Sequence, residues 1–209
     1  MRNALIQAIH NCDNNPDVRI IILNANGKNF CAGADLNHMR HMSTVSFEEN
    51  LSDAQKFAQL FYTLHECKKP TICCAQGKTI GGGLGLLSAC DIAIATHDAA
   101  FCFSEVKVGL VPATISPFVT QRIGYQAAKY HMMTAELFDT KKALKIGLID
   151  HVTEEPLLNV GLLLAESMLK NNQHAMQETK RWLNELRPIT EAQIKNAAHI
   201  LARARSKNH

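Results

Sequence analysis

An α/β fold is the class that this sequence predicts, and two patterns along the chain predict it. Over the first two thirds of the 209 residues, short runs rich in Ile, Val and Thr alternate with helical patterns. The last third is mostly helical. Because strands that alternate with helices pair in parallel, we expect an α/β core with parallel strands over residues 1–152. Residues 153–209 are expected to form a helical region, either a domain of its own or an assembly surface.

Each element has its own signal in the sequence. Leu5, Ile6 and Ile9 recur at helical spacing and predict a helix over 3–12, which Asn-Asn-Pro at 14–16 ends. The β-branched run 18–23 predicts a buried strand. The same signals predict, in chain order, a helix marked by Phe57, Leu60, Phe61 and Leu64, buried strands over 71–75 and 91–95 with a short helix over 84–90 between them, a helix over 143–146 that stops at Gly147, a strand over 148–152, and helices over 157–169, 175–186 and 191–204.

Composition and charge argue against several classes of function. The net charge is only +3 and the basic residues are scattered, which does not indicate a nucleic-acid binder. No apolar stretch approaches the ~18 residues that span a bilayer, so no membrane association is expected. The seven cysteines form no CxxC pair and the ten histidines no HxH or HExxH pair, so no bound metal is expected. Cysteines in apolar runs and no N-terminal apolar signal segment predict a reducing, cytoplasmic compartment.

Three consecutive glycines, Gly81, Gly82 and Gly83, lie between a predicted strand and a predicted helix. Glycines let the backbone come close to a ligand, and the amides at a helix start have no internal partner. Such a place favours a phosphate or a developing oxyanion. A tight turn with no ligand would give the same pattern, and no GK[ST] follows to make a phosphate-binding P-loop.

Two further stretches carry candidate chemistry. In Phe-Cys-Ala-Gly-Ala-Asp-Leu at 30–36, Asp35 is a candidate N-cap, and the amide of Ala34 would be a second exposed helix-start donor. Glu105 ends an apolar strand with Phe101, Phe103, Val106 and Val108 around it. A carboxyl group in apolar surroundings has a raised pKa, which suits general acid–base catalysis. The alternatives are a capped turn at 30–36 and, at 105, a solvated glutamate or one paired with Lys107.

Four stretches, taken in order and spacing, resemble the crotonase (enoyl-CoA hydratase/isomerase) superfamily. They are FCAGADL at 30–36, GGGLGLLSACDIAIA at 81–95, FSEVKVGLVP at 103–112 and MMTAELFDTKKALKIGLIDHV at 132–152. The flanking sequence is most similar to the methylglutaconyl-CoA hydratase branch. The resemblance implies a ββα-spiral core with a C-terminal helical oligomerisation region, an acyl-CoA thioester as substrate, and a homotrimer or dimer of trimers. It implies no cofactor beyond the CoA moiety of the substrate.

The resemblance also implies roles for individual residues. The backbone N–H groups of Ala34 and Gly82 would form the oxyanion hole around the thioester oxygen. Glu105 would deliver or remove the proton at the α-carbon. The residues implied to line the substrate path are Ala32, Gly33, Asp35, Leu36, Gly81, Gly83 and Pro112.

The sequence departs from the family pattern in two ways. Gly85 stands where hydratases with two glutamates carry the second one. Hydration of a 2-enoyl-CoA, branched or carboxylated as in methylglutaconyl-CoA, is favoured by the flanking sequence, with Glu105 alone or helped by a group such as His38. A single glutamate is also the arrangement of family isomerases. The chain is short at both ends and begins where an N-terminal hairpin would precede it, which leaves a non-catalytic CoA-binding relative as a third alternative.

Overall fold

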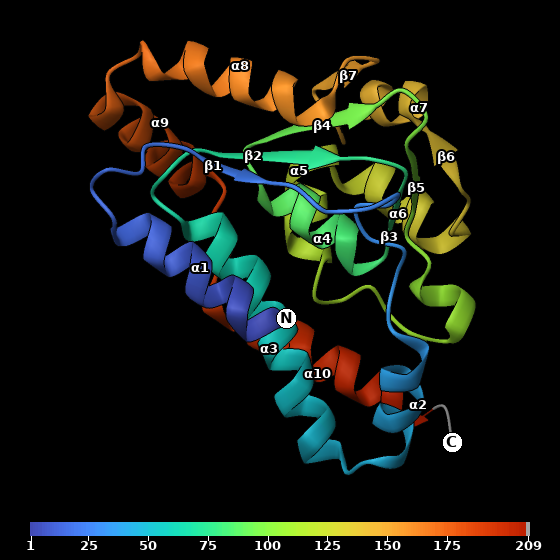
Figure 1. The fold of residues 1–209 in the computed structure, drawn as a ribbon. Helices are drawn as coiled ribbons and strands as arrows, with labels where there is room; N and C mark the ends of the chain where they lie inside the picture. The colour runs from blue at the N-terminus through green and yellow to red at the C-terminus, as the bar shows by residue number, and fades with distance from the viewer. Residues whose placement is uncertain (208–209) are drawn as a thin grey trace.

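The computed structural model describes residues 1–207, without the side chains of Leu36, Ser43 and Lys207 (Figure 1). Helices and strands alternate until residue 153, and three helices follow. In chain order the elements are α1 (Arg2–Asn14), β1 (Ile21–Leu23), α2 (Leu36–Thr44), α3 (Phe47–Glu66), β2 (Thr71–Ala75), β3 (Lys78–Ile80), α4 (Gly82–Ala89), β4 (Ile92–Thr96), β5 (Ala100–Cys102), the 3₁₀ helix η1 (Glu105–Val108), α5 (Ser116–Ile123), α6 (Tyr125–Thr134), β6 (Phe138–Asp139), α7 (Thr140–Lys145), β7 (His151–Thr153), α8 (Leu157–Leu169), α9 (Gln173–Leu186) and α10 (Glu191–Lys207).

The strands form two sheets that the chain visits in turn. The first sheet has the order β1-β2-β4-β7 and is parallel throughout. The second has the order β3-β5-β6, with β3 and β5 parallel and β5 and β6 antiparallel. Two successive pairs of strands, β2 with β3 and β4 with β5, follow the same pattern. The first strand of each pair joins the first sheet, the second joins the second sheet, and a helix follows. This repeated ββα unit confirms the predicted α/β core with parallel strands.

The first sheet is buried on both faces. Cys73, Ala75, Ala93 and Ala95 face the main core with α3, α4 and α5, while Ile72, Cys74 and Ile94 face a second cluster. This alternation follows the two-residue period of a strand. Helix α8 covers the second face, and a Cβ at Gly161 would lie only 2.7 Å from the Sγ of Cys74 (Figure 1). Helices therefore pack on both faces of the first sheet, with α4 on the face of the main core.

Some predicted boundaries agree with the structure and others differ. The strand over 71–75 and the helix over 157–169 are confirmed to the residue. The strand predicted over 18–23 is shorter, because Ile21 pairs with Thr71 and the preceding Pro70 has no N–H with which to extend the ladder. The strand predicted over 148–152 shifts to His151–Thr153, because the N–H of Leu148 donates to the carbonyl of Ala143 in α7, at 2.9 Å, instead of joining the sheet. Helix α4 begins at Gly82, two residues earlier than predicted.

The C-terminal helices confirm the predicted helical region. Helix α10 turns back and runs alongside α3, close to α2 (Figure 1). An ion pair between Arg205 and Asp53, with an N–O distance of 2.9 Å, joins α10 to α3. The division of the chain at residue 152 stays a prediction. Of the helices described, none is long and apolar enough to cross a bilayer.

Candidate active site

A short parallel bridge brings two of the predicted site stretches side by side. Cys31 pairs with Thr79, its N–H donates to the carbonyl of Lys78 at 3.0 Å, and its carbonyl accepts from Ile80 at 2.9 Å. The stretch 30–36 therefore runs along β3. Both segments then enter helices, the first at α2 and the second at α4. This pairing brings together two turns that the sequence predicts to share one site.

Each of the three glycines has a different structural role. Gly81 has φ +54°, and its N–H donates to the carbonyl of Cys102 at 3.0 Å. Gly83 is buried, and a Cβ there would lie 2.5 Å from the Cβ of Cys31, so its small size lets the two stretches approach. Gly82 is only half-buried and is the first residue of α4. Its amide belongs to the group that a helix leaves without an internal acceptor, and it is therefore the donor available to a ligand.

The segment around Ala34 differs in one respect from the prediction. Asp35 is the N-cap of α2, as predicted, and its carboxylate accepts from the amides of Asn37 at 2.8 Å and His38 at 3.3 Å. Ala34 therefore precedes the cap, and describing its amide as a helix-start donor was wrong. Gly33, with φ +112°, turns the chain just before it, and Ala34 is exposed. Its N–H can reach a ligand from a turn rather than from a helix terminus.

Three other predicted substrate-binding residues have different surroundings. Ala32 is exposed next to Gly33. The side chain of Leu36 lies outside the part that the structure describes. Pro112 is buried, and its carbonyl accepts from the amide of Ser116 at the start of α5, at 3.1 Å.

Glu105 lies beside the start of α4. It opens the 3₁₀ helix after β5, and its Oε1 is 3.5 Å from where a Cβ of Gly81 would stand. Its Oε2 is inaccessible to solvent and has no hydrogen-bond partner among the described residues, although the residue as a whole is only half-buried. Burial raises the pKa of Glu105 to about 7, against a hydrogen bond from its own backbone that lowers it. A carboxyl group with this pKa can both accept and donate a proton near neutral pH.

The surroundings of Glu105 correct two details. Phe101 and Phe103 are fully buried beside it, but Val106 and Val108 are 40% and 50% exposed and do not enclose the carboxyl group. The chain leaves the strand after Cys102, so the side chains of η1 no longer alternate. Lys107 points to the Sγ of Cys102 at 3.8 Å, and no ion pair between it and Glu105 is found among residues 1–207.

The position of Gly85 is filled by apolar side chains. A Cβ there would lie 2.5 Å from Cγ2 of Ile115 and 2.9 Å from Cε1 and Cζ of Phe61. Both neighbours are fully buried. There is no room for a carboxylate side chain at this position. The side chains of Ile115 and Phe61, which occupy the space, are apolar.

A cluster around Asp53 was missed by the sequence analysis. Its carboxylate pairs with Arg2 of α1 and Arg205 of α10, and lies 3.3 Å from Nε2 of His38 on α2. Within residues 1–207, as far as their side chains are described, the ring of His38 is directed to Asp53. The helical spacing of Asp53, Phe57 and Phe61 could have signalled a shared face of α3. Nothing in the sequence indicates that Arg2 and Arg205 meet there.

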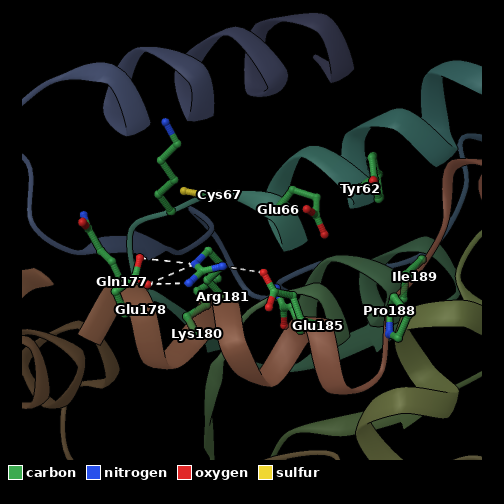
Figure 2. Close-up of a pocket in the computed structure, with 12 residues that line it drawn as sticks. Tyr62, Glu66, Cys67, Gln177, Glu178, Lys180, Arg181, Glu185, Pro188 and Ile189 are labelled. Atoms are coloured by element: carbon green, nitrogen blue, oxygen red, sulfur yellow. Dashed lines mark hydrogen bonds and ion pairs between the residues drawn. The ribbon is translucent and has the colours of Figure 1, made fainter. Parts of the chain in front are cut away.

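A hollow of about 540 Å³ lies elsewhere, between the end of α3 and α9 (Figure 2). Some of its charged side chains are paired within it: Arg181 contacts Glu178 and Glu185, each at 2.6 Å. Lys180 donates to Asp91 at 2.8 Å. None of the residues predicted to bind substrate lines it.

Comparisons with known proteins agree with this arrangement. The family model described as enoyl-CoA hydratase/isomerase matches residues 1–209. The crystal structure of an enoyl-CoA hydratase from Shewanella pealeana superposes with a TM-score of 0.86 and 41% identity, covering 97% of this chain and 77% of that one. A short-chain-enoyl-CoA hydratase of Clostridium acetobutylicum is 32% identical, covering 82% of this chain and 66% of the relative. A peroxisomal Delta(3,5)-Delta(2,4)-dienoyl-CoA isomerase of Arabidopsis thaliana is 33% identical, covering 88% and 70%.

The chain therefore belongs to the enoyl-CoA hydratase/isomerase family of enzymes, and the resemblance to this superfamily seen in the sequence is confirmed. It spans only part of each relative: 58% of the length of an enoyl-CoA hydratase of Alternaria alternata, for example. Members of one family share a fold while their reactions differ, so the reaction has to be argued from the site.

Proposed function

We propose that this chain hydrates a 2-enoyl-CoA, with Glu105 as its single proton-transfer residue. The observation that carries the proposal is the carboxyl group of Glu105, which titrates at a pKa of about 7 beside the start of α4. The amides of Gly82 and Ala34 are proposed to bind the thioester oxygen. The names of the Shewanella and Clostridium relatives support hydration over other reactions of the family.

The proposed steps need only these groups. The ionised Glu105 takes a proton from water while the water oxygen bonds to the β-carbon of the enoyl group. The electrons of the double bond move onto the thioester oxygen, where the two amides stabilise the enolate; removing one such donor costs about 10²–10³ in rate. Glu105 then gives its proton to the α-carbon, and the carboxylate is restored.

Isomerisation of a 3-enoyl-CoA is the second candidate, and the packing around Gly85 favours it. A hydratase benefits from a polar group that orients the attacking water, whereas Ile115 and Phe61 fill that position. Isomerisation needs no water: Glu105 would take a proton from the α-carbon and return it to the γ-carbon. The same amides would stabilise the dienolate.

Two absorbance assays separate the two reactions. With crotonyl-CoA, we expect the ultraviolet absorbance of the conjugated thioester to fall as water adds. An isomerase would instead raise this absorbance with trans-3-hexenoyl-CoA. Glu105→Gln is the matched control and should abolish either change. Binding of acyl-CoA with no change in either assay would contradict both candidates and support a non-catalytic CoA-binding role.

The acyl group is proposed to be branched or carboxylated, as in methylglutaconyl-CoA, on the similarity of the flanking sequence alone. Relative rates with methylglutaconyl-CoA and crotonyl-CoA in the same assay measure this preference. Equal or lower kcat/KM for the branched substrate would contradict it. The absence of a separate cofactor is likewise a proposal, and turnover by purified, dialysed protein tests it.

We also propose that the chain forms a trimer or a dimer of trimers. Helices α8 and α9 expose large apolar side chains, among them Leu162, Leu163, Trp182, Leu183 and Leu186. Exposed apolar surface of this kind marks contacts between subunits. Light scattering is expected to give a trimeric or hexameric mass that Trp182→Glu lowers. A monomeric mass for the unsubstituted chain would contradict the proposal.

A further inference from the structure

One aromatic side chain of α3 bounds the space next to the proposed oxyanion donor. A Cβ added to Gly82 would lie 3.9 Å from Cε1 of Phe57 and 3.9 Å from Cζ of Phe61. Phe61 is 1% exposed, whereas Phe57 is only half-buried. Phe57 is therefore the ring of this pair that open space can reach.

The ring of Phe57 is supported from its face by charge. The guanidinium carbon of Arg2 lies 4.1 Å from the ring centroid, a cation–π contact. Arg2 is itself fixed, because one nitrogen pairs with the carboxylate of Asp53 and another donates to the carbonyl of Asp53 at 3.3 Å. Arg205 from α10 holds the other carboxylate oxygen at 2.9 Å. Movement of the ring toward Arg2 would therefore disturb ion pairs that join three helices.

The direction along α4 is closed as well. One turn further into the helix, Ile115 and Phe61 meet at Gly85 within 2.9 Å of a built Cβ. These side chains occupy the space next to α4 at Gly85. Of the two rings near Gly82, only the half-buried Phe57 can border space that is open to an acyl chain.

We propose that Phe57 closes the acyl pocket and restricts this enzyme to short acyl groups, with Arg2 and Asp53 as positioning residues behind it. The inference rests on the proposed function, since the amides of Gly82 and Ala34 fix where the acyl chain begins. A long acyl chain would have to displace the ring against Arg2. A short one ends before reaching it.

The test is the dependence of kcat/KM on acyl length in four proteins. Crotonyl-CoA and 2-decenoyl-CoA are compared for the unsubstituted chain, Phe57→Ala, Phe57→Leu and Phe47→Ala. Phe47 begins the same helix and lies against His199, with the two rings tilted and their centroids 6.3 Å apart, so it is a matched aromatic control. Phe57→Ala is expected to raise the decenoyl-to-crotonyl ratio by about tenfold or more, as methylene-sized changes in apolar pockets do.

Phe57→Leu keeps an apolar side chain and is expected to raise the ratio by a smaller factor, while Phe47→Ala leaves it unchanged. A loss of equal size for both substrates in Phe57→Ala and Phe57→Leu would overturn the proposal, because that result indicates a structural role only.

Binding of saturated ligands keeps this test separate from the proposed reaction. Calorimetry with butyryl-CoA and decanoyl-CoA needs no turnover. Tighter binding of butyryl-CoA by the unsubstituted chain, with the preference lost in Phe57→Ala, would support the proposal even if no reaction is detected. Equal discrimination in both proteins would overturn it even if hydration is confirmed.

Discussion

Glu105→Gln is expected to lower turnover by about 10²–10⁴, the range that a positioned proton-transfer group contributes. Glutamine has nearly the shape of glutamate but cannot accept a proton from water or from an α-carbon. Oε2 of Glu105 is enclosed and has no described hydrogen-bond partner, and the hydrogen bond to the carboxylate comes from its own backbone, so the substitution breaks no described hydrogen bond with another element. Steady-state kinetics with crotonyl-CoA measure the effect. A decrease of less than about tenfold would contradict the role of Glu105 in proton transfer.

Stability measurements on the same variant distinguish lost chemistry from lost folding. The pKa of Glu105 is raised from 4.5 to about 7 in the folded chain, so folding favours the protonated form. Its contribution to stability is complete below pH 4.5 and is lost as the pH rises to about 7. At pH 8 the uncharged Glu105→Gln should therefore be more stable than the unsubstituted chain, by up to about 3 kcal/mol. Lower stability at pH 8 would show that the charged group is better solvated than its burial indicates.

The pH dependence of kcat/KM follows from the same group. The ionised carboxylate begins the proposed reaction, so kcat/KM should be constant above a pH of about 7 and fall tenfold per unit below it. An apparent pKa close to 4.5, as in a solvated glutamate, would mean that the carboxyl group is not enclosed in the active protein.

The parts of the site that the sequence could predict depend on neighbours in the chain. Asp35 caps α2 because its carboxylate reaches amides two and three residues ahead, which is a local pattern. The turn at the glycines before α4 is local in the same way, although the helix begins at Gly82 and not at residue 84 as predicted. The raised pKa of Glu105 was predicted from four apolar neighbours, and two of them, Phe101 and Phe103, are buried as that prediction requires.

The parts that could not be predicted depend on residues distant in sequence. From the sequence, Gly85 looks like a position that only lacks a carboxylate. In the structure the space beside it is filled by Phe61 and by Ile115, which lies thirty residues further along the chain. Val106 and Val108 read as strand residues, yet the turn into η1 directs them outward. Hydropathy alone does not distinguish these outcomes, because the packing partners belong to helices whose positions the sequence does not give.

Substitution of Asp53 is expected to have the largest effect on stability. Burial alone raises the pKa of Asp53, but the hydrogen bonds and charges of Arg2 and Arg205 outweigh it and hold the pKa at about 2, against 3.8 for an unperturbed aspartate. Asp53→Asn leaves both guanidinium groups with little exposure and no counter-charge. Removing one partner of a buried ion pair costs about 3–5 kcal/mol, and the partial exposure of Arg2 places the expected loss near the lower figure. For a chain of this length that corresponds to a fall in Tm of about 6–12 °C.

The matched control is Glu178→Gln, which removes a carboxylate that also pairs with an arginine, Arg181, but at an exposed site. It should leave Tm unchanged, because exposed ion pairs contribute little. The folded-state pKa of Asp53 is depressed, so its stabilisation is present above pH 3.8 and is lost as the pH falls toward about 2. Thermal unfolding at pH 7 and pH 3 therefore gives a second readout. Asp53→Asn should lose less stability between these pH values than the unsubstituted chain, and an equal loss in both would show that Asp53 does not anchor α10 to α3 through its charge.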